Sequence, residues 1–341
     1  MPLPQHHRKN GTFRNPAGSP VREAPLSEYL KFFARRVRSN FSRLRPPIGH
    51  VLPREDAVRR LHELRSHDTV TWLGHAAFLL RMGGKSILID PYLSETAGPG
   101  PFGPRRFAPP GLTLEDLPPI DVLLISHNHY DHLDGATIAR IPNKEHLHVV
   151  VPLRLGDYFI RRGFRNVIEL DWHDEKSMDA LRITSLPSVH WSKRGFADEN
   201  DSLWTGYAIE AKGAKVYYSG DTGYGKIFKE LGDRHGPFDL SLIGIGAYEP
   251  RSIMRASHAT PEEAVQIARD MQSNNILGMH WGTVILSDEP PFEPPERFHT
   301  AALDAGFTPN RIWRLAIGET RLLPAHIKNK APGPSGPGDL N

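Results

Sequence analysis

The chain has 341 residues, a formal net charge of +3 and 39% hydrophobic residues, which suits a globular protein of one large domain or two. It contains no cysteine, which excludes disulfides, thiolate metal sites and cysteine nucleophiles. No run reaches the roughly 18 apolar residues of a membrane-spanning helix, and the first twenty residues lack a signal-peptide core, so we expect a cytoplasmic protein.

The N-terminal region, residues 1–65, is strongly basic: it contains fourteen Lys and Arg against five Asp and Glu, and the remainder is net acidic. Residues 1–26 are rich in proline and glycine and predict an extended, poorly ordered arm. Residues 26–38 predict a basic amphipathic helix, which can lie on an anionic membrane surface or pack on the protein with its basic face in water. Its apolar positions are Leu30, Phe33 and Val37, and its basic ones are Lys31, Arg35, Arg36 and Arg38. No aromatic-rich or groove-reading element accompanies it, so we expect no nucleic-acid partner.

Residues 66–325 contain the elements of a folded domain, which opens with a hairpin-like pair of strands at 69–73 and 78–82. His75 between them either approaches a site or is a buried structural histidine. A third strand, 86–90, ends at Asp90. Residues 94–119 are dominated by glycine and proline and predict a long loop. We expect this loop to border a substrate groove through Phe102 and Phe107, with a plain surface excursion as the alternative.

A cluster of polar side chains follows the next strand directly. Residues 122–126 form an apolar run that predicts a buried strand, and His127, His129, Asp131 and His132 come at once after it. Imidazole nitrogen and carboxylate oxygen are zinc ligands. With this spacing, the first two histidines can reach one metal while Asp131 and His132 reach a second, and two metals about 3.5–4 Å apart are a known device for hydrolysis. A solvated polar loop is the alternative.

Further candidate ligands stand at or just after the ends of three later strand-like runs. They are His190 after 181–186, Asp221 after 215–219 and His280 after 275–279. If these strands end at one edge, His190 would complete the first metal site and His280 the second, and Asp221 would bridge both because a carboxylate has two oxygens to share. Lys193 and Arg194 could meet the charge of a phosphate, although surface lysines and arginines are common.

The remaining elements alternate in type. Residues 134–141, 155–163 and 261–271 predict helices, the last with Thr260 and Glu263 in capping-box positions. Residues 149–152, 167–170, 311–315 and 321–323 predict strands. Two β-rich halves with helices between them suggest a four-layer αββα sandwich with the metals at the edge where both sheets end. Residues 326–341 predict a flexible tail.

The ligand pattern, His127-x-His-x-Asp-His132 with His190, Asp221 and His280, resembles that of the metallo-β-lactamase superfamily. Within it, longer strings resemble the N-acylphosphatidylethanolamine-hydrolysing phospholipases D and their bacterial relatives. These strings are SHNHYDHLD at 126–134, VIELDW at 167–172, GDTGY at 220–224, GPFDL at 236–240, GIGAYEP at 244–250, His258 before PEEA at 261–264, and HWGT at 280–283. The resemblance covers roughly residues 69–322.

The resemblance implies the αββα fold, a homodimer and a dinuclear zinc centre, although manganese or iron also suits these ligands. It implies a phosphodiesterase that releases N-acylethanolamine and phosphatidic acid from N-acylphosphatidylethanolamine, with peripheral contact to the membrane. Zinc-activated water would be the nucleophile, and Asp131, Asp221 and His258 would be catalytic, with His258 contacting the phosphoryl group or assisting proton transfer. Asp90 would orient a ligand histidine and Thr222 would support Asp221.

Other functions fit the same ligand set. Lactonases and the phosphodiesterases of tRNA 3′ processing use it, and a non-catalytic protein could use the metal only to hold its fold. A lipid substrate predicts an apolar groove beside the metals, whereas a lactone predicts a closed polar pocket. An RNA substrate would call for a basic binding arm within the domain, but residues 66–341 are net acidic.

Overall fold

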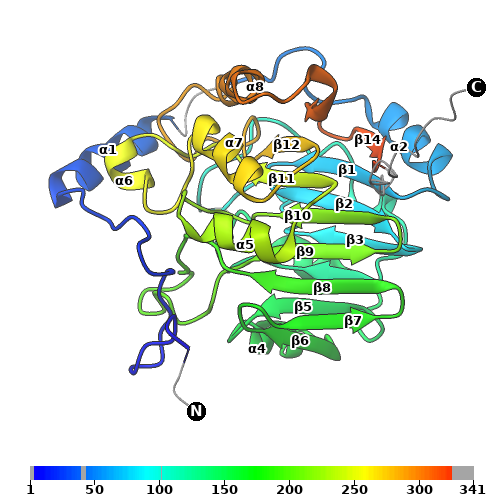
Figure 1. Cartoon of the computed structure of the whole chain (residues 1–341), viewed down its shortest axis with the longest axis horizontal. Coiled ribbons are helices and arrows are strands. Elements are labelled where there is room, and N and C mark those ends of the chain that lie inside the picture. The colour runs from blue at the N-terminus through cyan, green and yellow to red at the C-terminus, as the bar shows by residue number, and fades with distance from the viewer. Residues whose placement is uncertain (1–3, 40–43, 101, 325–341) are drawn as a thin grey trace, which may run out of the picture.

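The computed structural model describes residues 4–39, 44–100 and 102–324 (Figure 1). The side chains of residues 36–39 are outside the described part, so the predictions for Arg36, Val37 and Arg38 as helix-face residues are not addressed by it. The predicted tail, 326–341, also lies outside the described residues.

Two seven-stranded mixed sheets form the centre of the described chain. The first has the spatial order β14-β1-β2-β3-β4-β5-β6 and the second β13-β12-β11-β10-β9-β8-β7. The strands of the first sheet are β1 Thr69–Gly74, β2 Ala77–Met82, β3 Lys85–Ile89, β4 Val122–Leu124, β5 His148–Pro152, β6 Asn166–Leu170 and β14 Thr320–Leu322. Those of the second are β7 Glu175–Met178, β8 Leu181–Leu186, β9 Gly206–Ala211, β10 Ala214–Tyr218, β11 Leu240–Gly244, β12 Ile276–Met279 and β13 Ile312–Trp313.

The first sheet is apolar on both faces, because the side chains of its central strands alternate between two cores. On β4, Val122 and Leu124 belong to the core that contains the second sheet, whereas Leu123 belongs to the core shared with α2, α3 and α4. Val150 and its neighbour Val149 on β5 divide in the same way. The continuous apolar runs of the sequence therefore reflect strands buried on both sides.

Helices cover the two outer faces and complete four layers (Figure 1). The helices α2, α3 and α4 pack on the first sheet, and α5, α7 and α8 pack on the second. The predicted αββα sandwich is confirmed. The helices are α1 Leu26–Ser39, α2 Arg54–Glu63, α3 Gly135–Arg140, α4 Gly156–Ile160, α5 Ile227–His235, α6 Arg251–Met254, α7 Pro261–Asp270 and α8 Pro294–Asp304, with 3₁₀ turns at Leu114–Asp116 and Pro309–Arg311.

The predicted capping box at the start of α7 is confirmed. Thr260 Oγ1 accepts from the Glu263 backbone N–H at 3.2 Å, and Glu263 Oε2 accepts from the Thr260 N–H at 3.0 Å. Two of the otherwise unpaired amide groups at the helix start are thereby satisfied. The helix begins immediately after the loop that holds His258, so the cap also fixes where that loop ends.

The N-terminal arm packs along the domain, so the prediction of a poorly ordered arm is wrong for its described part. Phe13 is buried against Trp172, Leu203 and Trp204. The two Asp171 carboxylate oxygens lie 2.6 Å from His6 Nε2 and 2.8 Å from His7 Nε2. The burial of one large aromatic ring and these charge-assisted hydrogen bonds favour the packed position of the arm and act against the entropy of ordering it.

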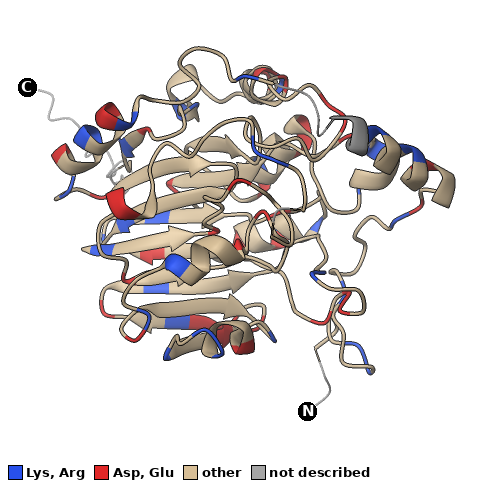
Figure 2. Cartoon of the chain, turned by 180° about the vertical axis from the view of Figure 1, so that it is seen from behind, with Lys and Arg blue, Asp and Glu red and all other residues tan. Residues whose placement is uncertain are grey.

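The charges on the surface are mixed in sign. In the view of Figure 2, Lys and Arg are interspersed with Asp and Glu and do not gather into one basic face. The helix α1 lies beside α6 (Figure 1) and is joined to it by a hydrogen bond from the Ser252 hydroxyl to the Glu28 carboxylate. None of the helices within the described ranges is both long and apolar enough to cross a bilayer.

Candidate metal centre and its groove

The predicted ligands come from loops at one edge of both sheets. The loop after β4 carries His127 to His132, and His190, Asp221 and His280 follow β8, β10 and β12 of the second sheet. Of the seven predicted ligands, His129 is partly buried and the other six are buried. Because the parallel strands end at a common edge, residues far apart in sequence meet there, such as Asp131 and His280, which are 149 positions apart.

Three histidines form the first group. His127 Nε2 lies 2.9 Å from His129 Nδ1, and His190 Nε2 lies 3.1 Å from the same atom. The opposite ring nitrogens are already used: His127 Nδ1 lies 2.9 Å from Ser126 Oγ, and His190 Nδ1 donates to the Ser257 carbonyl at 2.9 Å. The neutral rings therefore direct Nε2 lone pairs at His129, whose single Nδ1 proton can satisfy only one of them. A metal ion would satisfy all three nitrogens.

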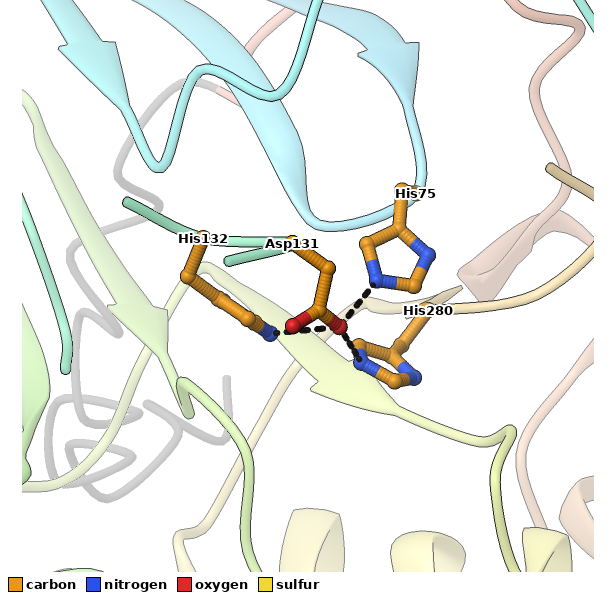
Figure 3. Close-up of side chains that lie close together, drawn as sticks. All are labelled: His75, Asp131, His132 and His280. Atoms are coloured by element: carbon orange, nitrogen blue, oxygen red, sulfur yellow. Dashed lines mark hydrogen bonds and ion pairs between the residues drawn. The ribbon is translucent and has the colours of Figure 1, made fainter. Parts of the chain in front are cut away.

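The second group gathers around Asp131 (Figure 3). Its Oδ2 lies 2.9 Å from His75 Nε2, 3.3 Å from His280 Nε2 and 3.6 Å from His132 Nε2. Sequence reasoning placed Asp131, His132 and His280 together and left His75 open. The structure brings His75 into the group, where it either orients Asp131 or is itself a ligand.

Asp221 lies between the two groups. Its Oδ2 is 3.2 Å from the Nε2 atoms of both His132 and His280, and 3.8 Å and 3.9 Å from those of His190 and His127. Its Oδ1 is buried and has no hydrogen-bond partner among the described residues. A buried carboxylate with a free oxygen, flanked by imidazoles on both sides, suits a ligand that bridges two cations.

Asp90 connects these loops through hydrogen bonds to its carboxylate. It is fully buried and accepts from His132 Nδ1 at 2.7 Å, from the Ser126 N–H at 2.7 Å and from the Tyr218 hydroxyl at 2.6 Å. Its contact with His132 fixes that ring with Nε2 toward Asp221, which is how outer carboxylates orient metal-ligating histidines. Sequence reasoning named Asp90 for this position but missed Ser126 and Tyr218, because a serine or tyrosine at a strand end carries no distinctive signal.

The pKa values divide the histidines into two sets. Burial lowers the pKa of His127 and His190 well below the usual value and lowers that of His129 to about 4, so these rings are neutral at pH 7. Burial would also lower the pKa of His280, but the Asp221 and Asp131 carboxylates outweigh it and raise that pKa to about 9. They raise the pKa of His132 as well. Bound cations would replace these protons.

Three residues of the cluster adopt a left-handed backbone conformation. His75, Asp90 and His280 have φ angles of +54°, +40° and +66°, a region that residues with a side chain rarely adopt. Gly246 is required beside the last of them, because a Cβ there would lie 2.0 Å from the His280 carbonyl oxygen. Such strain persists only where the surrounding structure holds it, and it is typical of functional sites.

Three other predicted residues have partners outside the groove. Arg194 Nη1 donates to the carbonyls of Asn128 and Leu133 at 3.0 and 2.7 Å, so it supports the ligand loop from within the protein. Lys193 lies 3.8 Å from Glu199 and does not line the groove described next. Thr222 Oγ1 accepts from the Val189 N–H at 2.8 Å and donates to the Gly223 carbonyl at 2.8 Å, which connects the chain beside Asp221 to the chain beside His190.

A groove of about 470 Å³ opens over the cluster. His129, Asp131, Asp221 and His258 line its floor, and its walls are largely apolar. The predicted contributions of Phe102 and Phe107 are wrong: Phe102 is 74% exposed, and Phe107 packs against the core. The loop 94–119 contributes Ala97 instead. The other wall residues are Arg22, Tyr29, Phe32, Phe33, Tyr130, Trp191, Ala247, Ile253, Met254 and Leu286.

His258 lies where the groove meets the cluster. Its Nδ1 is 3.9 Å from Asp221 Oδ2, and its ring packs on His190 and His280. Arg251 donates to its backbone carbonyl at 2.7 Å. Burial lowers the pKa of His258 to about 4, so the ring is neutral at pH 7 and can accept a proton or a hydrogen bond.

Comparison with known proteins agrees with this geometry. The profile of the beta-lactamase superfamily domain matches residues 85–281. The chain is 40% identical over 225 residues to N-acyl-phosphatidylethanolamine-hydrolyzing phospholipase D 1 of Caenorhabditis elegans, covering 62% of this chain and 63% of that one, so it spans less than two thirds of that protein. It is 30% identical to a metal-dependent hydrolase of Caldivirga maquilingensis, covering 74% of this chain and 97% of that one.

Solved structures support the same fold. The structure of isothiocyanate hydrolase from Delia radicum gut bacteria covers 75% of this chain and 99% of its own, with a TM-score of 0.61 and 22% identity. That identity is low enough that the likeness concerns the fold alone. The profile match spans more than half of the chain, the two sheets lie between helical layers, and the ligand loops meet at the sheet edge. This chain therefore belongs to the metallo-β-lactamase superfamily.

Proposed function

We propose that the protein is a dinuclear zinc hydrolase that cleaves a phospholipid phosphodiester, releasing N-acylethanolamine and phosphatidic acid from N-acylphosphatidylethanolamine. The coarse class, a metal-dependent hydrolase, is supported by the family and by the two His/Asp groups that could each hold a cation. The likeness to the C. elegans phospholipase D supports the substrate.

The apolar walls of the groove favour a lipid substrate over a small polar one. Tyr29, Phe32 and Phe33 on one side and Ile253 and Met254 on another are apolar, and they reach the same space as Asp221. Such walls contact acyl chains favourably at roughly 25 cal/mol for each Å² removed from water. A lactonase with a closed polar pocket would not need them.

Each group of the cluster has a defined part in this proposal. His127, His129 and His190 would hold one zinc ion, Asp131, His132 and His280 the other, and Asp221 would bridge them. When bound, zinc lowers the pKa of a coordinated water from about 15.7 toward 7 and stabilises negative charge on phosphoryl oxygens. His258, neutral and facing the groove, can accept a hydrogen bond from the substrate or take up a proton.

The membrane-facing side would be α1. Its residues Leu26 and Leu30 are 74% and 62% exposed, while Phe33 lines the groove beside them. An exposed apolar edge on a helix that also carries Lys31 and Arg35 can enter the interfacial region of an anionic bilayer. This edge would bring the mouth of the groove to the lipid headgroups.

The test uses zinc-loaded protein and N-acylphosphatidylethanolamine in mixed micelles, with phosphatidic acid release as the readout. We expect release that a chelator abolishes and that Asp221→Asn reduces by at least about a thousandfold, since the bridging carboxylate is lost. Asp233→Asn is the matched control, because Asp233 is an exposed residue of α5 that pairs with Lys229. Two bound metals without any lipid cleavage would reject the substrate, and fewer than two metals per chain would reject the dinuclear centre.

A further inference from the structure

The groove contains a positive charge that the loops of the superfamily domain do not supply. Arg22 belongs to the N-terminal arm, outside the matched residues 85–281. Among the described residues that line the groove, it is the one lysine or arginine. The arm and α1 thus form one wall of the candidate site, and this wall lies outside the matched domain.

Aromatic stacking fixes the position of Arg22. Its guanidinium carbon lies 4.0 Å from the centre of the Trp191 ring, and that ring packs edge-on against His129 with 4.6 Å between ring centres. Trp191 therefore contacts both the arginine and a histidine of the cluster, and all three line the same groove. Stacking on an aromatic face holds the planar guanidinium in place and leaves its N–H groups free at the edges.

The donors of Arg22 are only partly used. Nη1 lies 3.2 Å from Glu199 Oε1, an ion pair whose side chains are 36% and 48% exposed. Among the described residues, Glu199 is the one hydrogen-bond partner of the Arg22 guanidinium. An exposed ion pair contributes little to stability, so the arginine can exchange Glu199 for a ligand at low cost.

We propose that Arg22 binds a non-bridging oxygen of the anionic phosphodiester held at the His/Asp cluster, with Tyr29, Phe32 and Phe33 as the adjoining apolar wall. This inference rests on the proposed function. A phosphodiester keeps one negative charge on its two non-bridging oxygens, and guanidinium is the side chain whose parallel N–H groups match such oxygens. Lys193 and Arg194, which the sequence offered for this task, are turned to Glu199 and to backbone carbonyls.

The closing experiment measures binding separately from lipid turnover. Dibutyl phosphate, a soluble dialkyl phosphate, is titrated by calorimetry into the zinc-loaded full chain and into four variants. Arg22→Ala should weaken its binding about tenfold or more, the size of a charge-assisted hydrogen bond, and Arg22→Lys should recover part of the loss. Lys193→Ala removes the same charge beside the same Glu199 but outside the groove, and it should change binding less than about twofold.

Glu199→Gln separates ligand binding from a purely structural role. If Arg22 only pins the arm through its ion pair, Glu199→Gln should reproduce the effect of Arg22→Ala; if it binds the phosphodiester, Glu199→Gln should leave binding unchanged or tighter. In lipid turnover, Arg22→Ala should raise KM about tenfold with kcat nearly constant. Equal binding by Arg22→Ala and the wild type, an equal loss in Lys193→Ala, or no binding by the wild type would overturn the proposal. Arg22-dependent binding without lipid cleavage would overturn only the proposed substrate.

Discussion

Asp90 shows how much of the site depends on residues that would not touch a metal. Its carboxylate is completely buried, and it accepts hydrogen bonds from His132, Ser126 and Tyr218. Ser126 and His132 belong to the loop after β4, and Tyr218 ends β10, so one carboxylate just after β3 fixes the relative positions of the β3, β4 and β10 ends. Burying a charge is unfavourable unless it is fully paired, and here every partner also shapes the cluster.

Replacing Asp90 by Asn tests this role. We expect zinc affinity to fall by about 10- to 100-fold, because the amide can no longer accept from all of these donors and His132 loses its orientation. Circular dichroism should show that the fold persists, and zinc competition with a chromophoric chelator gives the affinity. Asp121→Asn, at a part-exposed carboxylate just before the other end of β4, is the control. Unchanged affinity in Asp90→Asn would contradict the role.

Metal binding should depend on pH because two histidines must lose a proton. In the metal-free protein the Asp221 and Asp131 carboxylates overcome the effect of burial and raise the pKa of His280 to about 9, so its ring is charged at pH 7. A raised pKa favours the protonated form at every pH below 9, and zinc must displace that proton. Apparent zinc affinity should therefore increase by roughly one to two powers of ten per pH unit between pH 6 and 8. A flat profile, after correction for the competing chelator, would argue against these ligands.

At the scale of elements, the helix α1 contributes both to the wall of the groove and to the solvent-exposed surface. Phe32 is buried, Tyr29 and Phe33 line the groove, and Leu26 and Leu30 are exposed to solvent. An amphipathic helix normally hides its apolar stripe. Here part of the stripe stays uncovered beside an opening that leads to the cluster, which is the arrangement expected of a helix that meets a membrane.

The double substitution Leu26→Ser and Leu30→Ser separates these two surfaces. Binding to vesicles that contain anionic lipid should weaken by about tenfold or more, since two exposed leucines contribute about 1.5–3 kcal/mol each when fully buried in lipid. Turnover of a soluble phosphodiester should not change, because neither residue lines the groove. Vesicle sedimentation measures the first quantity and a colorimetric assay the second. Vesicle binding equal to that of the wild type would remove α1 as the membrane contact.

At the scale of the whole molecule, the cluster joins the two sheets. His127, His129, Asp131 and His132 come from the first sheet, whereas His190, Asp221 and His280 come from the second. Cations held by both sets would connect the two halves of the sandwich at one edge. Metal binding would then contribute to folding as well as to chemistry, because the unfolded chain has no such site.

Chelation should therefore destabilise the protein. Each site contributes about 2.7 kcal/mol when the free metal is at 100 times its dissociation constant, so removal of zinc should lower Tm by several degrees and re-addition should restore it. Calorimetric scans with and without chelator measure the change. Asp221→Asn should show a smaller chelator effect than the wild type. A Tm that is independent of chelator would mean that the cluster holds no stabilising metal.

The local patterns that were predicted correctly are those with short-range causes. The apolar run before His127 predicted a strand buried on both faces, and Thr260 with Glu263 predicted a helix start, because both depend on neighbours in sequence. The loop motif named the candidate ligands in advance, since few other roles explain three histidines and an aspartate in six positions. Which of these residues bind metal stays a proposal.

The contacts that sequence reasoning missed are made between distant segments. Arg22 and Tyr29 reach the groove only because the arm folds back along the domain. The side chains of Thr222 and Arg194 form hydrogen bonds with backbone groups, and no sequence motif predicts these bonds. His75 joins Asp131 across 56 positions because β1 and β4 end at the same edge. The sequence by itself thus determined which side chains are candidate ligands and which strands are buried on both faces, because residue type and period are local properties. Only the tertiary structure decided which side chains share a space, because that depends on how the two sheets, the arm and α1 pack.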